Sequence, residues 1–395
     1  MSRLDELIQQ YCPDGVAYVA LETVCLISKG IQFNKKDMHD EGTYPVINGG
    51  INPSGYIEQY NQEEKTITIS QGGASAGFVN WLDTKFWAGA HCYVLKPTNN
   101  VLNRYLFHFV KSKEYKLQEC QYGAGIPALA KSTVASLEIP VPPLEVQSEI
   151  VRILDNFTEL TAELTAELTA RKKQYEYYRD TLLKSSIEIK NVKLGSVCEV
   201  YDGTHQTPKY TNSGVPFVSV ENIDDLYGTT KYISAEDFSK YRIKPRIGDV
   251  FMTRITAGVI GRCTVVDRND DLAYYVSLAL LRPEQSILDS KYLKYYLESG
   301  WGRKELAKRI LWDATPTKIN KDDIGEVYIS LPPLEVQQRL VRVLDNFDSI
   351  CSDLNIGLPA EIEARKKQYE FYRDALLTYA ATDKTILTDR QTDRQ

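Results

Sequence analysis

The residue patterns that could support catalysis are few in this chain. The EEK triplet at 63–65 resembles the acidic and lysine half of a metal-dependent nuclease site, but such triplets are common by chance in solvated turns. The NPS triplet at 52–54 departs from the Asn-Pro-Pro-Tyr/Phe motif of an adenine methyltransferase. The GAG triplet at 123–125 lacks the strand–turn–helix context of a cofactor loop, and no Gly-x-x-x-x-Gly-Lys-Ser/Thr sequence is present. We therefore expect no catalytic residue.

Metal binding and disulfide formation are also disfavoured. The seven cysteines are scattered without a Cys-x-x-Cys pair, and the four histidines do not cluster. This pattern indicates free thiols in a reducing cytoplasm and no metal site. The N-terminus has no signal-peptide pattern, and no apolar run is long enough to span a bilayer. We expect a cytoplasmic protein without a membrane partner.

The strongest feature of the sequence is an internal duplication. PPLEVQSEIVRILDNF at 142–157 returns as PPLEVQQRLVRVLDNF at 332–347, an offset of 190 residues. ARKKQYEYYRDTLL at 170–183 returns as ARKKQYEFYRDALL at 364–377, an offset of 194. A fainter echo relates Val19 and its neighbours to Val192 and its neighbours. The repeating unit is a variable globular region followed by a nearly constant helical region.

The globular regions combine short strands with a few helices, which predicts α+β domains. A short helix is expected over 2–11, longer helical segments over 103–115 and 290–310, and strands over 65–70, 91–95, 215–220, 247–255 and 274–281. The predicted domain boundaries are 1–141, 142–186, 187–331 and 332–379, with a disordered polar tail over 380–395.

The helical copies carry apolar residues at steps of three, four or seven, which is typical of a coiled-coil seam. If the first copy is continuous over 143–184, it forms a helix of roughly 60 Å at 1.5 Å per residue. A lone helix of that length needs a partner, and the second copy is the obvious one. Gly357 and Pro359 should interrupt that second helix. Leu160, Leu164 and Leu168 should share one stripe, and Glu167 should pair with Arg171.

These blocks, with TAELTAEL at 161–168, resemble the specificity subunits of type I restriction–modification systems. The match is strongest to the type IC group, in which TAEL is tandemly repeated. DGTHQTPKY at 202–210 and GDVFMTR at 248–254 are similar to segments of the family's target-recognition domains. The resemblance implies an α+β protein with two such domains, separated by two long helices that pack as an antiparallel coiled coil with pseudo-two-fold symmetry.

The resemblance also implies function and partners. Each recognition domain would read one half of a bipartite double-stranded DNA target, and the helices would set the distance between the halves. Two methyltransferase subunits would dock on the chain and methylate adenine with S-adenosylmethionine. Restriction subunits would cleave DNA with ATP and Mg²⁺. These cofactors are expected on the partners and none in this chain.

A transcriptional regulator with two DNA-binding domains is the alternative. No helix-turn-helix pattern supports it, and the formal net charge of −6 is unusual for a free-standing DNA binder. Local basic patches, or a partner's charge, could still permit DNA binding.

Candidate DNA contacts are polar or basic residues in turns and at one helix end. They are Asn48, Asn52, Gln71 and Ser75 in two glycine-rich turns, then His205, Gln206, Lys209, Thr253, Arg254, Thr256, Lys304, Lys308 and Arg309. The glycine-rich turns could cradle phosphate or be plain hairpin turns. Arg254 is the best candidate for a bidentate contact with guanine, and a surface salt bridge is its alternative. His91 is expected to be packed within a strand.

Candidate docking residues for the methyltransferase subunits lie in the RKKQYEYYRD block and its copy. They are Tyr177, Arg179, Phe371 and Arg373. The alternative is a coiled-coil seam with a solvated face. We favour a mixture, because Tyr177 falls outside the seam and an aromatic residue returns at 371.

Overall fold

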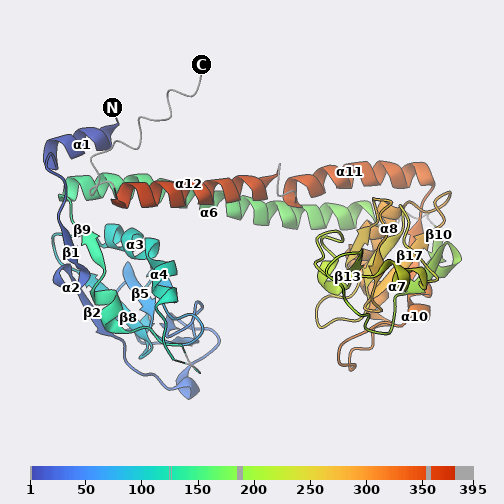
Figure 1. Ribbon diagram of the computed structural model, residues 1–395, viewed down its shortest axis with the longest axis horizontal. Helices are drawn as coiled ribbons and strands as arrows, with labels where there is room; N and C mark the ends of the chain where they lie inside the picture. The colour runs from blue at the N-terminus through green and yellow to red at the C-terminus, as the bar shows by residue number, and fades with distance from the viewer. Residues whose placement is uncertain (1, 124, 126, 185–189, 353–356, 379–395) are drawn as a thin grey trace. The chain divides into compact units, whose positions relative to one another are not determined.

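The computed structural model describes residues 2–123, 125, 127–184, 190–352 and 357–378 (Figure 1). The chain forms two compact units, one of residues 1–165 and 361–395 and one of residues 166–360. We call them unit 1 and unit 2. The expected tail over 380–395 lies outside the described residues.

Unit 1 contains a mixed globular part and helical segments from both copies of the repeat. Its elements are α1 (Arg3–Tyr11), β1 (Tyr18–Ala20), α2 (Leu21–Val24), β2 (Cys25–Lys29), η1 (Lys35–Asp37), β3 (Tyr44–Ile47), β4 (Tyr56–Ile57), β5 (Thr66–Ser70), β6 (Val79–Leu82), β7 (Trp87–Ala88), β8 (Cys92–Pro97), α3 (Asn103–Ser112), α4 (Glu114–Glu119), α5 (Lys131–Ala135), β9 (Glu138–Pro140), the first part of α6 (Leu144–Leu182) and most of α12 (Leu358–Thr378).

Unit 2 has the same kinds of element. They are the rest of α6, then β10 (Lys190–Lys193), η2 (Leu194–Ser196), β11 (Cys198–Asp202), β12 (Val215–Val218), η3 (Val220–Asn222), β13 (Tyr232–Ile233), α7 (Ala235–Ser239), β14 (Val250–Thr253), β15 (Cys263–Val265), β16 (Ala273–Tyr274), β17 (Leu278–Pro283), α8 (Ser290–Glu298), α9 (Gly300–Ala307), α10 (Lys321–Gly325), β18 (Tyr328–Leu331) and α11 (Leu334–Ser352).

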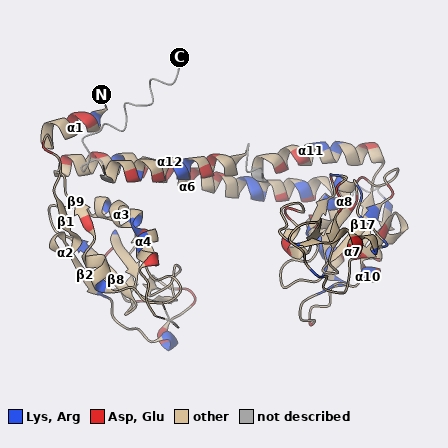
Figure 2. Cartoon of the chain, in the orientation of Figure 1, with Lys and Arg blue, Asp and Glu red and all other residues tan. Residues whose placement is uncertain are grey.

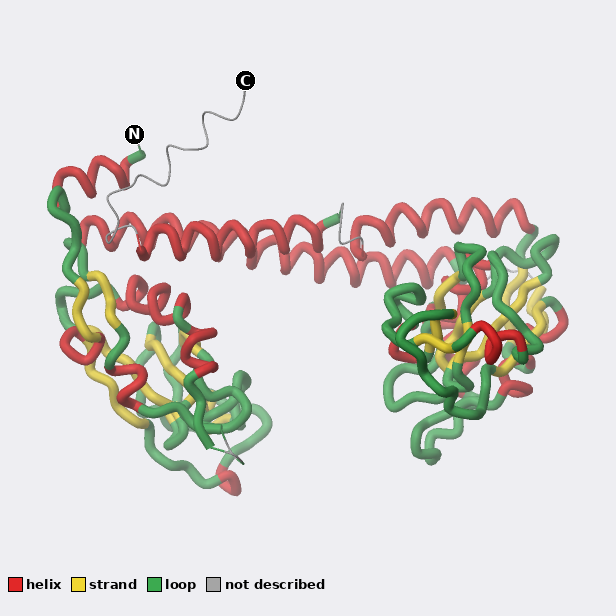
Figure 3. The backbone as a smooth tube through the Cα atoms, in the orientation of Figure 1, coloured by secondary structure: helices red, strands yellow, loops and turns green. Residues whose placement is uncertain are grey.

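The two globular parts share one sheet topology, although their sequences differ. The order β2-β8-β5-β6 in unit 1 corresponds to β11-β17-β14-β15 in unit 2, and both sheets are antiparallel. The order β4-β3-β7 corresponds to β13-β12-β16, each with one parallel pairing. The pair β1-β9 corresponds to β10-β18. The duplication therefore extends through the globular domains, where much of each chain path is loop (Figure 3).

Most of the predicted elements are present, but three long segments are divided. The segments over 65–70, 91–95, 215–220 and 247–255 each contain a strand. The segment over 274–281 holds β16 and β17, and that over 103–115 holds α3 and the start of α4. The helix expected over 290–310 divides at Ser299, whose hydroxyl accepts a hydrogen bond from the Gly302 amide and starts α9.

The helical copies differ in continuity, as predicted. Helix α6 runs unbroken for 39 residues, whereas α11 ends at Ser352 and α12 begins at Leu358. Pro359 occupies the first turn of α12, where a missing amide proton costs nothing. The TAEL leucines are partly buried, and Glu167 pairs with Arg171 at 3.2 Å. Residues of both charges lie along α6 (Figure 2).

Within each unit, the helices join the core of the globular part. In unit 1, Leu154 of α6 and Leu376 of α12 lie in the main apolar core, and Phe157 stacks on Tyr372 with ring centroids 5.2 Å apart. In unit 2, Leu344 of α11 is in the core, and Tyr178 stacks on Phe347 at 5.9 Å. The same positions of the two repeats make the same kind of contact.

A fully buried glutamine fixes the first turn of each repeat's helix to the globular part. Gln147 and Gln337 have no exposed surface. Each amide oxygen accepts one backbone N–H and each amide nitrogen donates to two carbonyls, at 2.7–2.9 Å. The partners are Leu102, Asn100 and Pro142 for Gln147, and Asp289, Ile287 and Pro332 for Gln337.

A second polar contact joins α3, α6 and α12 in unit 1. The buried His108 ring contacts the Asp155 carboxylate through Nε2 at 2.8 Å and the Tyr369 hydroxyl through Nδ1 at 3.0 Å. Arg104 pairs with the same carboxylate at 2.7 Å. Burial lowers the pKa of His108 despite the nearby Asp155, so the neutral ring donates from Nε2 and accepts at Nδ1. In unit 2, the corresponding Asp345 instead accepts from Tyr295 and Lys291.

This difference predicts a pH response that belongs to unit 1. Because the folded pKa of His108 lies below its unfolded value of about 6.5, the unfolded chain takes up the proton first. The free energy of unfolding should therefore be highest with respect to this group above pH ~6.5. It should fall as the pH drops below that value, by at most about 1.4 kcal/mol per pH unit.

Denaturant unfolding between pH 7.5 and 5.5 tests this prediction. His108→Gln keeps a donor for Asp155 but does not titrate, so its unit-1 transition should show a flatter pH dependence than the parent. The other three histidines are exposed and serve as the internal background. If the free energy of unfolding changes with pH equally in parent and variant, His108 is not the titrating group.

Candidate nucleic-acid interface

Three loops meet at one end of the four-stranded sheet in each unit. In unit 1 they are residues 71–77 after β5, 89–91 before β8, and 121–123 with 127–129 after α4. In unit 2 they are residues 254–261 after β14, 275–277 before β17, and 310–319 after α9. We call these sets loop cluster 1 and loop cluster 2. Each brings together segments that are distant in sequence, so each is a candidate binding surface.

Corresponding backbone hydrogen bonds of 2.8–3.0 Å hold both clusters. In loop cluster 1 they run from Gln71 N to His91 O, Leu129 N to Gln71 O, Gly73 N to Pro127 O and Tyr122 N to Ala128 O. In loop cluster 2 they run from Arg254 N to Ser277 O, Ile319 N to Arg254 O, Thr256 N to Thr317 O and Leu311 N to Lys318 O. The two backbones therefore match at these four hydrogen bonds, while the side chains that they present differ.

Glycine is required where these loops turn or approach one another. Gly77 and Gly261 have φ of +89° and +87°, and each donates its amide to the last residue of the preceding strand. A Cβ on Gly49 would lie 2.4 Å from the Gly72 carbonyl oxygen. The two glycine-rich turns of unit 1 therefore contact each other through their backbones.

The predicted contacts of unit 1 lie in or beside loop cluster 1. Asn52 is exposed, whereas Gln71 and Ser75 are partly buried. Asn48 is partly buried, and its side-chain oxygen accepts the His91 amide at 3.0 Å. The expectation for His91 was wrong, because β8 begins one residue later and His91 is exposed in the turn before it.

Arg254 is buried and paired inside the domain. Its side chain is 7% exposed, pairs with the Asp202 carboxylate, and donates from Nε to the Ile319 carbonyl at 3.1 Å. The neighbouring Thr253 is also buried, and its hydroxyl donates to the Val259 carbonyl. Both side chains are used inside the domain, and their DNA contacts stay predictions. The alternative of a surface salt bridge for Arg254 is wrong, because its ion pair is buried.

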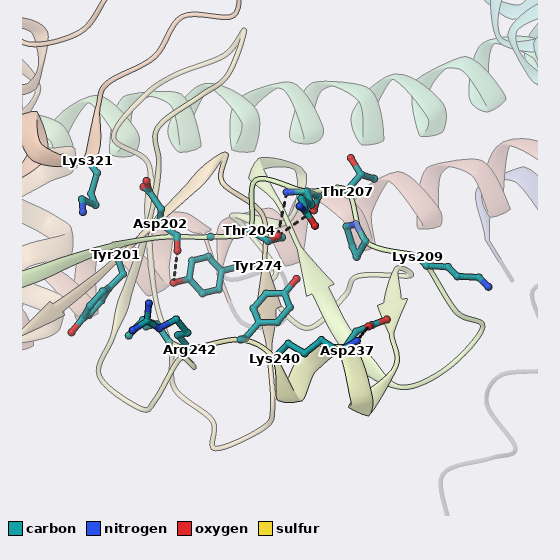
Figure 4. A pocket seen from close by; sticks show the side chains of 15 residues that line it. Tyr201, Asp202, Thr204, Thr207, Lys209, Asp237, Lys240, Arg242, Tyr274 and Lys321 are labelled. Atoms are coloured by element: carbon teal, nitrogen blue, oxygen red, sulfur yellow. Dashed lines mark hydrogen bonds and ion pairs between the residues drawn. The ribbon is translucent and has the colours of Figure 1, made fainter.

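A cleft of about 650 Å³, lined by tyrosines and charged side chains, opens beside this ion pair in unit 2 (Figure 4). It contains the predicted Gln206 and Lys209. His205 is exposed nearby, with its ring 3.7 Å from Asp202. The cleft also has lining residues that the sequence did not single out, namely Tyr201, Lys240, Tyr241, Arg242, Tyr274 and Lys321. Lys240 pairs with Asp237 at 2.8 Å, while Arg242 is exposed. Cations and tyrosines in one cleft suit an anionic aromatic ligand such as a nucleotide unit.

The remaining predicted cations of unit 2 are partly neutralised. Lys308 and Arg309 both pair with Glu305 on α9. Lys304 is exposed, with its ammonium group 5.2 Å from the centre of the Trp301 ring. Thr256 is partly buried in loop cluster 2 and accepts a hydrogen bond from Gly258 N. A phosphate contact at this helix end would rest mainly on Lys304 and Lys308.

The predicted docking aromatics are well exposed. Tyr177 on α6 has 68% of its surface exposed and Phe371 on α12 has 50%. Each ring makes an edge contact with the tyrosine that follows it, at 5.6 and 5.5 Å between ring centroids. The two repeats therefore present an aromatic side chain in the same local setting.

The predicted docking arginines are placed differently. The side chains of Arg179 and Arg373 are largely buried, and each lies over a tyrosine of its own helix, Tyr175 or Tyr369. Each also pairs with the aspartate that follows it. Their guanidinium groups therefore support the helix surface in this chain, and their docking contacts stay predictions.

The family to which the chain belongs follows from its similarity to known proteins. The family model described as "Type I restriction modification DNA specificity domain" matches residues 13–171 and 186–364, one copy for each repeat. The chain belongs to this family. Its role is therefore DNA sequence specificity in a type I restriction–modification system, not transcriptional regulation.

Individual relatives agree with this assignment. A putative type I restriction enzyme specificity subunit of Haemophilus influenzae is 31% identical over 363 residues, which cover 88% of this chain and 91% of the relative. The EcoR124I/EcoR124II specificity subunit of Escherichia coli is 29% identical over 369 residues, covering 87% and 89%.

Solved structures show the same fold. A chain from a type I restriction–modification system, solved in work on complex assembly and conformational transition, is similar with a TM-score of 0.59 and 23% identity, covering 92% of this chain and 98% of that chain. The S subunit from M. genitalium gives a TM-score of 0.53 at 17% identity, covering 94% and 98%. Among the residues that the structure describes, no helix has the length and apolarity needed to cross a membrane.

The buried ion pair in unit 2 generates a prediction. Arg254→Ala should destabilise unit 2 by about 1–3 kcal/mol, because it leaves the Asp202 carboxylate and the Ile319 carbonyl without their donor. Arg242→Ala, which removes an exposed cation of the same unit, should change stability by less than about 0.5 kcal/mol. Denaturant unfolding of both variants measures this contrast. If the Arg254→Ala variant is fully stable and its base preference is altered, the result would instead support the predicted contact between Arg254 and guanine.

Proposed function

We propose that each unit reads one half of a bipartite DNA target through its loop cluster. The observation that supports this proposal is the matched backbone of the two clusters, because it presents different side chains at equivalent positions. His91 in unit 1 corresponds to Ser277 in unit 2, and Ala128 corresponds to Lys318. Two readers with one backbone and different side chains suit a target with two different halves.

Two methyltransferase subunits are the proposed partners, one for each repeat. Tyr177 and Phe371 supply an exposed aromatic residue at equivalent positions, and aromatic residues are enriched in protein interfaces. Adenine methylation with S-adenosylmethionine would take place on those subunits, and ATP- and Mg²⁺-dependent cleavage on restriction subunits. The chain itself would supply no catalytic residue or cofactor, and a cytoplasmic location would give it access to DNA.

The helices are the proposed ruler between the half-sites. We assign the chain to the TAEL-bearing type IC group and propose that α6 packs with α11 and α12 as an antiparallel coiled coil. Support comes from the partly buried leucines of the TAEL repeats and from the aromatic stack that each unit forms between its helices. A helix of fixed length between two readers would define the spacing of their targets.

The proposed function is tested by sequencing the methylome of a host that carries this chain and its partner subunits. Adenine methylation should occur in a split motif with two different halves and a fixed unspecified spacer. A continuous motif, or two halves of identical sequence, would contradict two independent readers. The same assay gives the parent motif for the next test.

Changing the number of TAEL repeats tests the ruler. One extra TAEL after Leu168 adds four helical residues, or about 6 Å, while DNA rises about 3.4 Å per base pair. The insertion also rotates the following helix by about 40°, so repacking should absorb part of the length. The methylome should show a spacer longer by about one base pair and unchanged half-sites. Deleting residues 165–168 is the reciprocal control, and an unchanged spacer with full activity would contradict the ruler.

Charge substitution tests the docking surface. Tyr177→Glu or Phe371→Glu should lower co-purification of the methyltransferase subunits, because a carboxylate would enter an apolar contact. Tyr115→Glu is the matched control, since that tyrosine is 73% exposed on α4 and outside the repeat blocks. Circular dichroism should show unchanged helix content in all three variants. Normal assembly of the variant that carries both Tyr177→Glu and Phe371→Glu would show that the docking surface lies elsewhere.

A further inference from the structure

Loop cluster 2 presents a large aromatic side chain that the domain does not use in its core. The side chain of Trp312 is 64% exposed, and its neighbour Leu311 is exposed as well. Val259, on the adjoining loop of the same cluster, is a third exposed apolar side chain. Exposed apolar groups gathered in one place indicate a binding surface more than single scattered ones do.

The loop that carries Trp312 is held in place on both sides. Leu311 N donates to the Lys318 carbonyl at 2.8 Å, and Ile319 N donates to the Arg254 carbonyl at 2.9 Å. The indole Nε1 donates to the Ala307 carbonyl at the end of α9, at 3.3 Å. The exposed ring is therefore positioned by the fold before any ligand arrives, which lowers the entropic cost of binding.

The charge around this loop identifies the class of ligand. Residues 303–319 contain five lysines or arginines and two acidic residues, in a chain whose net charge is −6. Lys304 on α9 and Lys308, which directly follows α9, are both exposed, and Lys308 also pairs with Glu305. An apolar protein partner would not require this local excess of cations, whereas the phosphates of DNA would. An aromatic side chain beside basic residues is the usual combination for stacking on a base.

The corresponding loop of unit 1 repeats the feature. Tyr122 is 57% exposed, lies 190 residues before Trp312, and occupies the hydrogen-bonded position that Leu311 has in unit 2. The two recognition domains otherwise differ widely in sequence. An exposed aromatic residue therefore lies at nearly the same place in both loop clusters.

We propose that Trp312 inserts at a base step that unstacks in the bound half-site of unit 2 and stacks on the base exposed there, and that Lys308 binds a neighbouring phosphate. This inference rests on the proposed function and adds the mode of contact. Both faces of a base in a duplex are covered by its neighbours, so the contact first costs the free energy of unstacking. Because every base has a π-face, stacking on the exposed base then contributes affinity with little preference for base identity. The base-edge contacts of the rest of the cluster would provide the sequence preference.

The test uses the assembled complex with its methyltransferase subunits and a DNA duplex that carries the methylome-defined target. Trp312→Ala should weaken binding by about 5- to 150-fold, which corresponds to stacking of one base. The slope of log affinity against log salt should not change, because no phosphate contact is lost. Trp312→Phe should keep most of the affinity, and Lys308→Ala should reduce the slope by about one.

Ile247→Ala is the matched control, because Ile247 is an exposed apolar side chain of the same unit outside the loop cluster. The complex with this variant should bind the duplex with the affinity of the parent complex. Thermal unfolding of each variant separates loss of contact from loss of fold. Parent-like affinity of a folded Trp312→Ala variant would overturn the stacking proposal, as would a loss that comes entirely from a smaller salt slope. If the parent complex itself shows no preference for the split target, the proposed function fails instead.

Discussion

The buried glutamine at the start of each helical copy is the contact on which the arrangement of each unit depends. A primary amide removed from water costs several kcal/mol unless its donors and acceptor are satisfied. Gln147 and Gln337 meet this condition with three hydrogen bonds each, all to backbone atoms of the recognition domain or of the turn before the helix. Because the partners are backbone atoms, the side chains of the domain can vary while the joint between domain and helix stays the same.

The same principle operates at the loop clusters. Their hydrogen bonds also join backbone atoms, so one loop geometry tolerates different residues at the surface. Where a side chain takes on a structural role, the two units differ: Arg254 pairs with Asp202 in unit 2, whereas Gln71 occupies the equivalent position in unit 1. A constant backbone with variable side chains is what a family needs in order to change its DNA target without changing its fold.

Periodicity and repetition made the local elements and the duplication predictable. Helix α6, the break before Pro359 and four of the strands follow from patterns within a few residues of one another. The long-range contacts did not follow. Arg254 is buried in an ion pair with Asp202, 52 residues earlier, and the cleft is lined in part by Arg242, which lies in no motif. The misplacement of His91 came from a strand boundary that is one residue off, an error that periodicity alone does not correct.

Hydrogen–deuterium exchange of the assembled complex, with and without its target duplex, tests the central claim most directly. If both loop clusters face DNA, amides at 71–77 and 254–261 should exchange more slowly in the bound complex. The strand pairs β1-β9 and β10-β18, which lie outside both loop clusters, should be unchanged. Protection in only one cluster, or protection confined to surfaces away from both, would contradict the account of two matched readers.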